Sequence, residues 1–284
     1  MLIVIESGST KADWMIVNGD QRYQASTMGF NPYFHNEADV ETAVRAVDKL
    51  VEIAHSVSDI YFYGAGCSQP ELNEKIERGL QKLFTNASIS VGHDLDACAF
   101  ATYSGVPEIA CILGTGSNSC YYDGEEVYEE IPALDFILGN EGGGTDFGRT
   151  LLSDYLYKRL PSQLHNELQD MGLDKPTIVE NVYMSSSANV YIASFMPAIL
   201  KHRELPYCQN LIKDGFKRFI EIHVRCYENY KNVEVNFVGS IAHLLSKELY
   251  EVCEEEGLNV GSVIRRPLDN LVQFHLNQSK EKVL

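Results

Sequence analysis

Residues 2–17 of the chain, LIVIESGSTKADWMIV, predict a β-hairpin around which the rest of the sequence is organised. Residues 2–5 are apolar and mostly β-branched, which favours a buried strand, and residues 14–17 form a second apolar run that pairs with it. The turn between them carries small and hydroxyl-bearing residues, so its backbone N–H groups can approach an anion without obstruction by bulky side chains. This stretch alone leaves two interpretations open, a phosphate-binding turn and an ordinary glycine–serine hairpin.

A second hairpin of the same kind favours the phosphate-binding interpretation. Residues 110–113 are an apolar strand, residues 114–119 are the turn GTGSNS, and residues 120–122 continue as a strand. Neither turn is a P-loop, because the Gly-x-x-x-x-Gly-Lys-[Ser/Thr] pattern is absent, and the pair Gly114-x-Gly116 lacks the third glycine of a dinucleotide-binding turn. Two such hairpins predict two similar halves that face one nucleotide.

A third segment completes this pattern. Residues 235–243, VNFVGSIAH, predict a strand, a glycine turn at Gly239-Ser240 and then a helix, a shape that suits contact with an adenosine moiety. We expect a bulky residue in place of Gly239 to weaken nucleotide binding and to leave the fold intact.

The composition excludes several classes of protein. A length of 284 residues with 45% hydrophobic residues suits two domains of ordinary size, each with its own core. The net charge of -17 argues against a nucleic-acid-binding surface. Seven cysteines without a Cys-x-x-Cys pair predict reduced thiols in a cytoplasmic protein. We expect no signal peptide and no membrane contact, because the chain starts directly with a strand and no apolar run is long enough to span a bilayer.

Between the two hairpins, predicted strands alternate with predicted helices. The strands are expected at residues 22–28, 59–63 and 87–91, and the helices at residues 39–55, 70–84 and 94–103. This alternation predicts a sheet with parallel members that is covered by helices, and ligands bind such sheets at the carboxyl ends of the strands. The polar or glycine residues at those ends are Glu6, Asn31, Gly64 and Asp94.

The second part of the chain repeats the first. Strands expected at residues 108–113, 117–122 and 126–131 form another meander, which indicates an internal duplication. Three glycines at residues 142–144 precede a helix expected at residues 145–159, and they could let the backbone approach a ligand, act as a hinge, or form a plain flexible loop. Further helices are expected at residues 187–200, 206–230, 244–256 and 267–278, with a last strand at residues 259–264.

In their order along the chain, these motifs resemble those of the actin-like ATPase superfamily, which includes sugar kinases, heat-shock ATPases and actin. The sequence is most similar to N-acetylglucosamine kinases and BadF/BcrA-type ATPases. The similar segments are ESGSTKADW at residues 6–14, GFNP at 29–32, LGTGSN at 113–118, GNEGG at 139–143 and RPLDNL at 266–271. Because these segments span nearly the whole chain in the family's order, the resemblance is more specific than any single motif.

The resemblance implies an α/β fold of two actin-like ATPase (ribonuclease H-like) domains, each a mixed sheet covered by helices, with a cleft between them. The first domain would comprise residues 1–106 and 268–284, and the second would comprise residues 107–267. ATP and Mg²⁺ would be the cofactors, a sugar would be the substrate, and the protein would be a cytoplasmic homodimer.

The resemblance also implies roles for individual residues. ATP would be bound by the two turns and the adenosine motif, through Ser7, Gly8, Ser9, Thr10, Lys11, Gly114, Thr115, Gly116, Ser117, Gly239 and Ser240. The sugar would be bound by Asn31, Gly64, Asn118, Asn140 and Glu141. Glu6 would hold Mg²⁺ through water, because a carboxylate at a strand end suits a hydrated Mg²⁺. Glu6 and Asn140 both stand where the family usually has aspartate, so the exact sugar stays open.

Phosphoryl transfer to a sugar requires a base for the hydroxyl proton, and an aspartate at a strand end can serve as one. Asp94 and Asp96 are the two candidates. Asp94 directly follows a predicted strand, where the family has its aspartate, whereas Asp96 would lie in the first turn of the next helix. Both could instead favour the helix dipole. We expect Asp94 to be the base.

These features predict an ATP-dependent kinase that phosphorylates a hydroxyl of an amino sugar, N-acetylglucosamine or a relative. The alternative is a BadF/BcrA-type ATPase that couples ATP hydrolysis to a conformational change in a partner. Activators of that type share an iron–sulfur cluster through cysteines, and no suitable cysteine pair occurs in this sequence. A third possibility, a nucleotide-sensing regulator, would leave Asp94 without a role.

Overall fold

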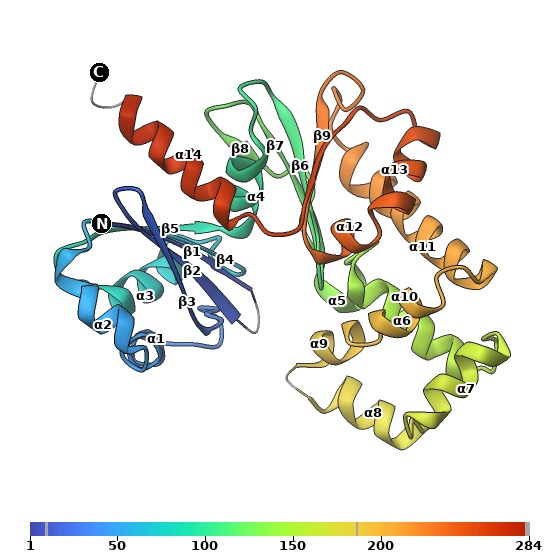
Figure 1. Cartoon of the computed structure of the whole chain (residues 1–284). Helices are drawn as coiled ribbons and strands as arrows, with labels where there is room; N and C mark the ends of the chain where they lie inside the picture. Colours follow the sequence, from blue (N-terminus) through green and yellow to red (C-terminus); the bar gives the residue numbers. More distant parts are fainter. Residues whose placement is uncertain (9–10, 186, 282–284) are drawn as a thin grey trace. The chain divides into compact units, whose positions relative to one another are not determined.

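The computed structural model describes residues 1–8, 11–185 and 187–281, and the chain divides into two compact units. Unit 1 consists of Met1–Tyr103 together with Arg266–Leu284, and unit 2 of Ser104–Arg265. The chain therefore crosses between the units twice, after helix α4 (Asp94–Thr102) and before helix α14 (Leu268–Glu281) (Figure 1). Each unit has its own sheet and its own hydrophobic core.

Unit 1 is built on a five-stranded mixed sheet in the order β3-β2-β1-β4-β5. Its strands are β1 (Leu2–Ser7), β2 (Lys11–Asn18), β3 (Gln21–Met28), β4 (Asp59–Gly64) and β5 (Ser88–His93). Strands β1 to β3 form an antiparallel meander, while β4 and β5 run parallel to β1. The first predicted hairpin and the mixed sheet that follows it are confirmed.

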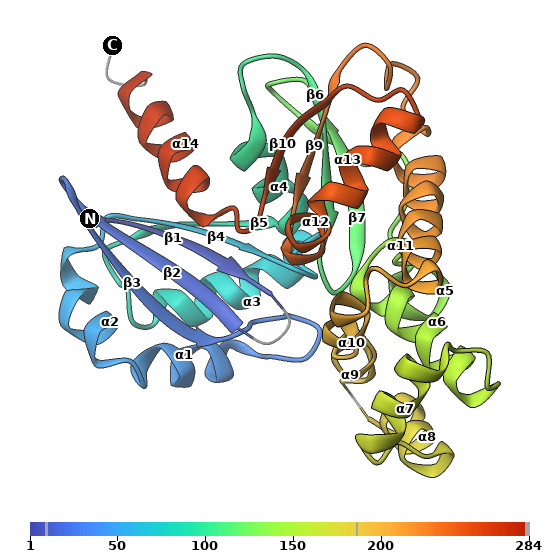
Figure 2. The same ribbon diagram turned by 45° about the vertical axis from the view of Figure 1, so that its right-hand side comes forward.

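Helices cover both faces of this sheet (Figures 1 and 2). Helices α1 (Glu37–Arg45), α2 (Asp48–Ile53) and α3 (Pro70–Gln81) lie on one face, and α4 and α14 lie on the other. Ile3, Val4 and Ile5 are fully buried, because β1 is a central strand with helices on both sides. On the α14 side, His275 stacks on Tyr61 with ring centroids 3.6 Å apart.

The sheet of unit 2 repeats this topology. Its strands are β6 (Glu108–Leu113), β7 (Ser117–Tyr122), β8 (Val127–Tyr128), β9 (Glu234–Val238) and β10 (Val260–Ile264). Their order from β8 to β10 is β8-β7-β6-β9-β10, with an antiparallel meander and two parallel strands as in unit 1. The internal duplication predicted from the repeated hairpin is therefore present in the fold.

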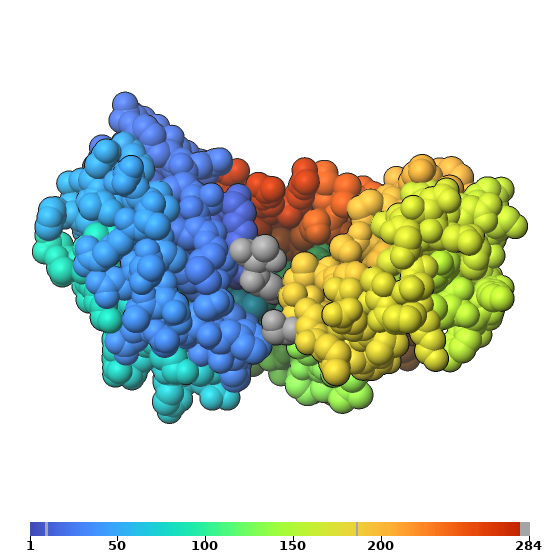
Figure 3. Space-filling view, turned by 90° about the horizontal axis from the view of Figure 1, so that it is seen from below, coloured from blue at the N-terminus to red at the C-terminus, as the bar shows by residue number. Residues whose placement is uncertain are grey.

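One face of the unit 2 sheet packs on helices, and Ile109, Cys111 and Leu113 of β6 are fully buried there. The elements outside the sheet include α5 (Asp135–Leu138), α6 (Gly144–Leu156), α11 (Pro206–Phe219), a π-helical turn at Ile220–Val224, α12 (Ser240–Leu244) and α13 (Ser246–Glu255). Unit 2 is extended by α7 (Ser162–Asp170), α8 (Lys175–Tyr183), α9 (Ala188–Ala193) and α10 (Met196–Lys201), the green-to-gold part of Figure 3. Within the described residues, no helix combines the length and apolar character that crossing a membrane requires.

Several predicted elements differ from the structure. The helix expected at residues 39–55 breaks between α1 and α2, because Val47 has an extended backbone. The helix expected at residues 187–200 divides into α9 and α10, because Pro197 has no N–H with which to continue the hydrogen bonds of the preceding turn. Strand β8 covers only Val127–Tyr128 of the expected 126–131, and α8 lies where the sequence predicts no element.

Candidate active site

The carboxyl ends of three parallel strands meet at one edge of the unit 1 sheet. Ser7 of β1 pairs with Gly64 of β4, and Gly64 pairs with His93 of β5, so the three residues form one row across the sheet. Glu6 lies one position before this row, and Asp94 lies one position after it. The structure thus brings these predicted residues to the edge at which open α/β sheets bind ligands.

The surroundings of Glu6 are negatively charged. Glu6 pairs with Asp13 across β1 and β2. Burial of the carboxyl group raises the pKa of Glu6 to about 7. The charges of Asp13 and Asp94 contribute to this rise in the pKa, and Arg266 opposes it. A cation bound at this edge would therefore favour the ionised form of Glu6.

The raised pKa of Glu6 predicts a pH-dependent stability for unit 1. The ordinary pKa is 4.5, so between pH 4.5 and about 7 the folded protein binds more protons than the unfolded chain. The free energy of unfolding should therefore fall as the pH rises through this range. Glu6→Gln should remove this fall in the free energy of unfolding. The variant should therefore be more stable than the wild type by up to about 3 kcal/mol at alkaline pH, with little difference at acidic pH.

Urea unfolding above and below this pH range, without Mg²⁺ or nucleotide, measures the effect. The fluorescence of Trp14 reports on unit 1, because Trp14 is the single tryptophan and is fully buried there. Glu77→Gln, at an exposed position of α3, is the control. A stabilisation of equal size at both pH values would contradict the prediction.

The loop after β3 is fixed against the row of strand ends. Ser7 is 2% exposed, and its Oγ accepts a hydrogen bond from Phe30 N at 2.8 Å. The Asn31 side chain accepts a hydrogen bond from Tyr33 N at 2.9 Å and packs on Gly66, where an added Cβ would lie 2.9 Å from Asn31 Oδ1. The hydroxyl of Ser7 thus holds the loop, and direct contacts of Ser7 with ATP and of Asn31 with a sugar stay predictions.

The first phosphate turn is closed by a hydrogen bond from Gly8 N to Lys11 O at 3.0 Å. The Lys11 side chain is about half exposed, and its Nζ lies 2.5 Å from Asp13 Oδ1. Ser9 and Thr10, two of the predicted ATP-binding residues, lie outside the described residues. The turn therefore offers one lysine that already has a carboxylate partner.

The two candidate bases have different surroundings. Asp96 is the third residue of α4, and its Oδ2 accepts a hydrogen bond from His93 N at 2.8 Å. This contact belongs to a capping box, so Asp96 stabilises the start of α4. Burial raises the pKa of Asp96. Asp94 has 36% of its side chain exposed and lies 3.2 Å from His93 Nε2. The capping role of Asp96 favours Asp94 as the base.

In unit 2, helix α6 begins directly on the second predicted phosphate-binding turn, residues 114–119, which is called the second phosphate turn below. Gly144 N donates to Gly114 O at 2.9 Å, and the next N–H of the helix donates to Thr115 O at the same distance. An added Cβ on Gly143 would lie 2.9 Å from the backbone of Gly116. This close approach of two backbones accounts for Gly143, while Gly142 has a left-handed backbone with φ of 66° and Gly144 packs on Ala193. The sequence leaves the glycine run open between a ligand contact, a hinge and a flexible loop.

Two hydroxyl groups in this region are buried without a hydrogen-bond partner among the described residues, namely Ser117 Oγ and Thr145 Oγ1. A buried polar group without a partner costs free energy, so such groups suit a site that a ligand completes. Hydroxyl groups can donate to the oxygens of a phosphate. The second turn therefore has the donor chemistry that a nucleotide requires.

The loop between α5 and α6 carries two predicted sugar contacts. Asn140 has a left-handed backbone with φ of 63°, and its Oδ1 accepts a hydrogen bond from Ser117 N at 3.2 Å. Glu141 Oε2 lies 3.3 Å from Nε2 of His223, which is 3% exposed. Burial lowers the pKa of His223, although Glu141 acts in the opposite direction. Asn140 thus stabilises the phosphate turn, and a histidine of the π-helical turn orients Glu141.

We expect Asn140→Ala to lower the free energy of unfolding of unit 2 by about 2 kcal/mol. Alanine would leave Ser117 N without its acceptor and would be strained at a positive φ. Asn140→Asp is the matched control, because aspartate keeps an acceptor and tolerates the left-handed region. Chemical unfolding followed by far-UV circular dichroism measures both variants. An alanine variant as stable as the wild type would contradict the structural role of Asn140.

The adenosine motif packs on the start of the phosphate turn. Gly239 has φ of 132°, and its N–H donates to Ile264 O at 2.9 Å. An added Cβ on Gly239 would collide with Leu113 O at the end of β6. Ser240 follows as the first residue of α12. The expectation that a bulky residue at Gly239 leaves the fold intact is therefore wrong, because the collision is with backbone.

Several residues that shape the site were not predicted from sequence, namely Asp13, Glu129, Asp146 and His223. Glu129 Oε1 accepts a hydrogen bond from Asn118 Nδ2 at 2.9 Å, so Asn118 has a partner in unit 2 and its sugar contact stays a prediction. Asp146 accepts from Gly142 N at 3.0 Å and so fixes the glycine run. The pairing of the first hairpin, which can be read from the sequence, places Asp13 opposite Glu6, so the role of Asp13 could have been predicted. His223 is 82 residues from Glu141 in the sequence, so no local pattern could have predicted their contact.

The family resemblance implies Mg²⁺, and the residues at the unit 1 edge fit it. The described part of the chain has no group of three or more metal-binding side chains. Mg²⁺ in nucleotide sites needs fewer, because one or two carboxylates hold it together with water and phosphate oxygens. Glu6 supplies such a carboxylate, whereas Asp13 opposite it is already paired with Lys11. The raised pKa of Glu6 indicates a place where a cation would be favourable.

Comparison with solved structures finds close matches to the whole chain. A candidate N-acetylglucosamine kinase from Porphyromonas gingivalis is 33% identical with a TM-score of 0.93, over 98% of this chain and 100% of that chain. A second candidate N-acetylglucosamine kinase, from Chromobacterium violaceum, has a TM-score of 0.77 at 15% identity, over 96% and 98%. A ROK family glucokinase from Streptomyces griseus, in complex with glucose and AMPPNP, has a TM-score of 0.55 at 14% identity, over 95% and 97%. The last two show likeness of fold alone. No family model and no curated protein matches the sequence.

Proposed function

Since the chain belongs to the N-acetylglucosamine kinase-like family of the actin-like ATPase superfamily, we propose that it is an ATP-dependent sugar kinase acting on a hydroxyl of an amino sugar, N-acetylglucosamine or a relative. The observation that carries the proposal is the place of Asp94, directly after the row of strand ends that contains Ser7 and Gly64. A carboxylate at such an edge can take the proton of a sugar hydroxyl. Asp96 is occupied by the capping of α4.

We assign the nucleotide to the glycine turns. Backbone N–H groups of the turns at Gly8 and Gly114 would hold the phosphates, and the buried hydroxyls of Ser117 and Thr145 support this assignment because they have no described partner. Gly239 packs closely on the end of β6 and so lies at the start of the second turn. The adenosine would lie near Gly239. The sugar would be held by Asn31, Gly64, Asn118, Asn140 and Glu141.

Mg²⁺, held by Glu6 through water, would supply neutralising charge to the phosphates. The residues of the chain provide the remaining requirements of the reaction. Asp94 would orient the acceptor hydroxyl and receive its proton, while the loop fixed by Ser7 and Gly66 would set the position of Asn31. Phosphoryl transfer depends mainly on such positioning.

ADP release from ATP over a panel of sugars, with and without Mg²⁺, tests the proposal. The panel contains N-acetylglucosamine, glucosamine and N-acetylmuramic acid, with glucose as the sugar that lacks the amino group. Release that requires both Mg²⁺ and one of the amino sugars supports the kinase. Release that no sugar stimulates supports the ATPase alternative, in which hydrolysis drives a change in a partner. Nucleotide binding without any release supports a nucleotide-sensing regulator.

From the family resemblance we also propose that the protein acts in the cytoplasm as a homodimer. The match to a candidate kinase over 98% of this chain supports a partner set of ATP and a small sugar. Light scattering of the purified full-length chain measures the mass in solution and so tests the dimer.

A further inference from the structure

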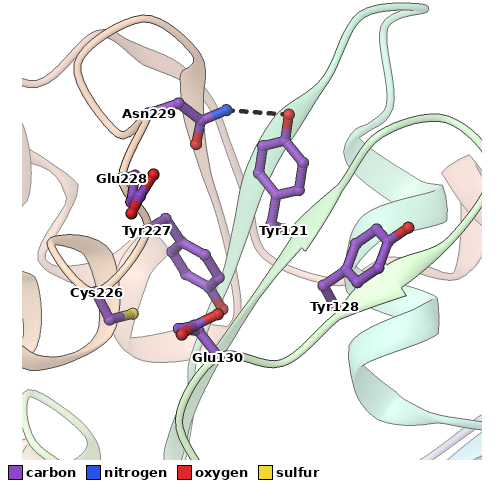
Figure 4. Close-up of a pocket in the computed structure, with 7 residues that line it drawn as sticks. All are labelled: Tyr121, Tyr128, Glu130, Cys226, Tyr227, Glu228 and Asn229. Atoms are coloured by element: carbon purple, nitrogen blue, oxygen red, sulfur yellow. Dashed lines mark hydrogen bonds between the residues drawn. The ribbon is translucent and has the colours of Figure 1, made fainter.

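Unit 2 has a surface pocket that the proposed kinase reaction does not use (Figure 4). Its volume is about 280 Å³, and it lies between β7, β8 and the segment that follows the π-helical turn. The residues that line it are Tyr121, Tyr128, Glu130, Cys226, Tyr227, Glu228 and Asn229. We call this set the tyrosine pocket.

The tyrosine pocket is separate from the second phosphate turn. Ser117 begins β7 at that turn, whereas Tyr121 is four positions further along the same strand. At 3.3 Å per residue, the two positions are roughly 13 Å apart along the strand. The pocket contains none of the residues assigned to the nucleotide or the sugar. A ligand could therefore occupy it without displacing the proposed substrates from unit 2.

Three tyrosine rings form the walls of the pocket. The ring centroid of Tyr121 lies 6.4 Å from that of Tyr128 and 6.2 Å from that of Tyr227. The hydroxyl of Tyr121 accepts a hydrogen bond from Asn229 Nδ2 at 3.0 Å, the contact drawn in Figure 4. Tyr227 is 6% exposed, and its hydroxyl lies 3.3 Å from Ser119 Oγ. The rings of Tyr121 and Tyr227 are therefore held in place before any ligand arrives, which lowers the entropic cost of binding. Tyr128 is 45% exposed, and its hydroxyl donates to Glu126 Oε2 at 3.0 Å.

The pocket is lined by two glutamates and by no lysine, arginine or histidine. Glu130 and Glu228 are both exposed, and within the described part of the chain neither forms an ion pair. Two cations lie near the pocket on the same segment. Arg225 is already paired with Glu221 and Glu256, and Lys231 lies over the ring of Tyr230. Such a site repels phosphates and other anions, and it has two carboxylates that a neutral ligand would leave without a counter-charge.

We propose that the tyrosine pocket binds a compact organic cation, a ligand that carries an ammonium or quaternary ammonium group. The faces of tyrosine rings attract such groups, and recognition of quaternary ammonium by cages of aromatic rings is an established use of this interaction. Glu130 and Glu228, which also line the tyrosine pocket, add the opposite charge. The volume of about 280 Å³ suits a small ligand rather than a polymer segment.

Isothermal titration of the full-length chain with choline tests the proposal, and 3,3-dimethylbutan-1-ol is the matched probe because it has the same shape without the charge. We expect choline to bind and the neutral probe to bind at least tenfold more weakly, or not at all. The titration contains no ATP and no sugar, so its result does not depend on the proposed kinase activity. Absence of choline binding, or equal binding of the two probes, would overturn the proposal.

Two variants locate the binding to this pocket. Tyr128→Ala and Glu228→Gln change exposed side chains of the pocket, and each should weaken choline binding at least threefold. Glu125→Gln is the control, because Glu125 is exposed on the same hairpin as Tyr128 but does not line the pocket. It should bind choline as the wild type does. Unchanged binding in a folded Glu228→Gln variant, or equal losses in all three variants, would place the cation elsewhere and overturn the assignment.

Discussion

Asp94→Asn should lower the rate of sugar phosphorylation by roughly 10²–10⁴-fold, the range typical for removal of a general base. Asparagine keeps the shape of the side chain and can still form hydrogen bonds, but it cannot accept the proton of the sugar hydroxyl. Asp94 lies next to the strand ends of β1, β4 and β5, and in the proposed arrangement it faces the acceptor sugar rather than the adenosine. We therefore expect the affinity for ATP to be nearly unchanged.

The matched control for this prediction is Asp96→Asn. The Asp96 side chain accepts a hydrogen bond from His93 N, and the carbonyl oxygen of asparagine can accept the same bond. This variant should keep most of its activity and lose at most about 1 kcal/mol of stability from the weakened cap. Steady-state kinetics with ATP titration separates the two effects. If Asp94→Asn keeps its phosphorylation activity and Asp96→Asn loses it, the base is Asp96 instead of Asp94. If both variants keep their activity, neither aspartate acts as the base and the proposed mechanism is wrong.

Gly239→Val should destabilise unit 2 by about 4 kcal/mol or more, which is a large part of the stability of an ordinary domain. The cause is steric, because any Cβ at this position collides with the carbonyl oxygen of Leu113. That oxygen belongs to the end of β6, which is held between β7 and β9 and cannot move aside without breaking the sheet. The backbone of Gly239, with φ of 132°, is also one that residues with a side chain rarely adopt.

Gly257→Ala separates the steric collision from backbone strain. Gly257 has φ of 71°, and no atom lies within 4 Å of an added Cβ, so this variant should lose only about 1 kcal/mol. Chemical unfolding followed by circular dichroism reports on the whole chain, and Trp14 fluorescence reports on unit 1, so a lost transition can be assigned to unit 2. If Gly239→Val is no less stable than Gly257→Ala, the close approach of Gly239 to β6 is not important for the fold.

The destabilisation expected for Gly239→Val also changes how nucleotide binding should be tested. Loss of ATP binding in that variant would follow from an unfolded unit 2 and would not locate the adenosine. Ser240→Ala is the better probe, because Ser240 is the first residue of α12 and the change removes only a side-chain hydroxyl. A folded Ser240→Ala variant with weakened ATP binding would support the proposed place of the adenosine.

The local pattern of the sequence was enough to predict the two hairpins. Residues 2–17 alternate between a buried apolar run, a turn and a second apolar run, and the structure has β1 and β2 there with the turn between them. The same holds for β6 and β7, whose bounds match the predicted strands at both ends. Strand pairing across a tight turn is local, so it leaves a clear mark on the order of residues.

The prediction was weaker where a local pattern fits more than one structure. The apolar spacing over residues 39–55 suits one long helix, but the chain breaks at Val47 and continues as α2. The three glycines before α6 suit a loop, a hinge or a ligand contact equally well. The reason for Gly143 became clear only from the fold, in which an added Cβ would lie 2.9 Å from the backbone of Gly116, a residue of a segment that is separate in sequence.

The repeated α/β topology, the edge of the sheet where the polar residues gather, and the order of motifs that assigns the family can all be predicted from the amino-acid sequence. These features depend on burial and on turn chemistry, which act between near neighbours. The sequence does not reveal that Asp96 caps a helix, that Ser7 Oγ accepts a hydrogen bond from Phe30 N, or that His223 orients Glu141. Each of these depends on which side chain reaches a particular partner. That choice is made by the packing of whole elements, and a hydrogen bond between residues as far apart as Glu141 and His223 leaves no periodic signal in the sequence.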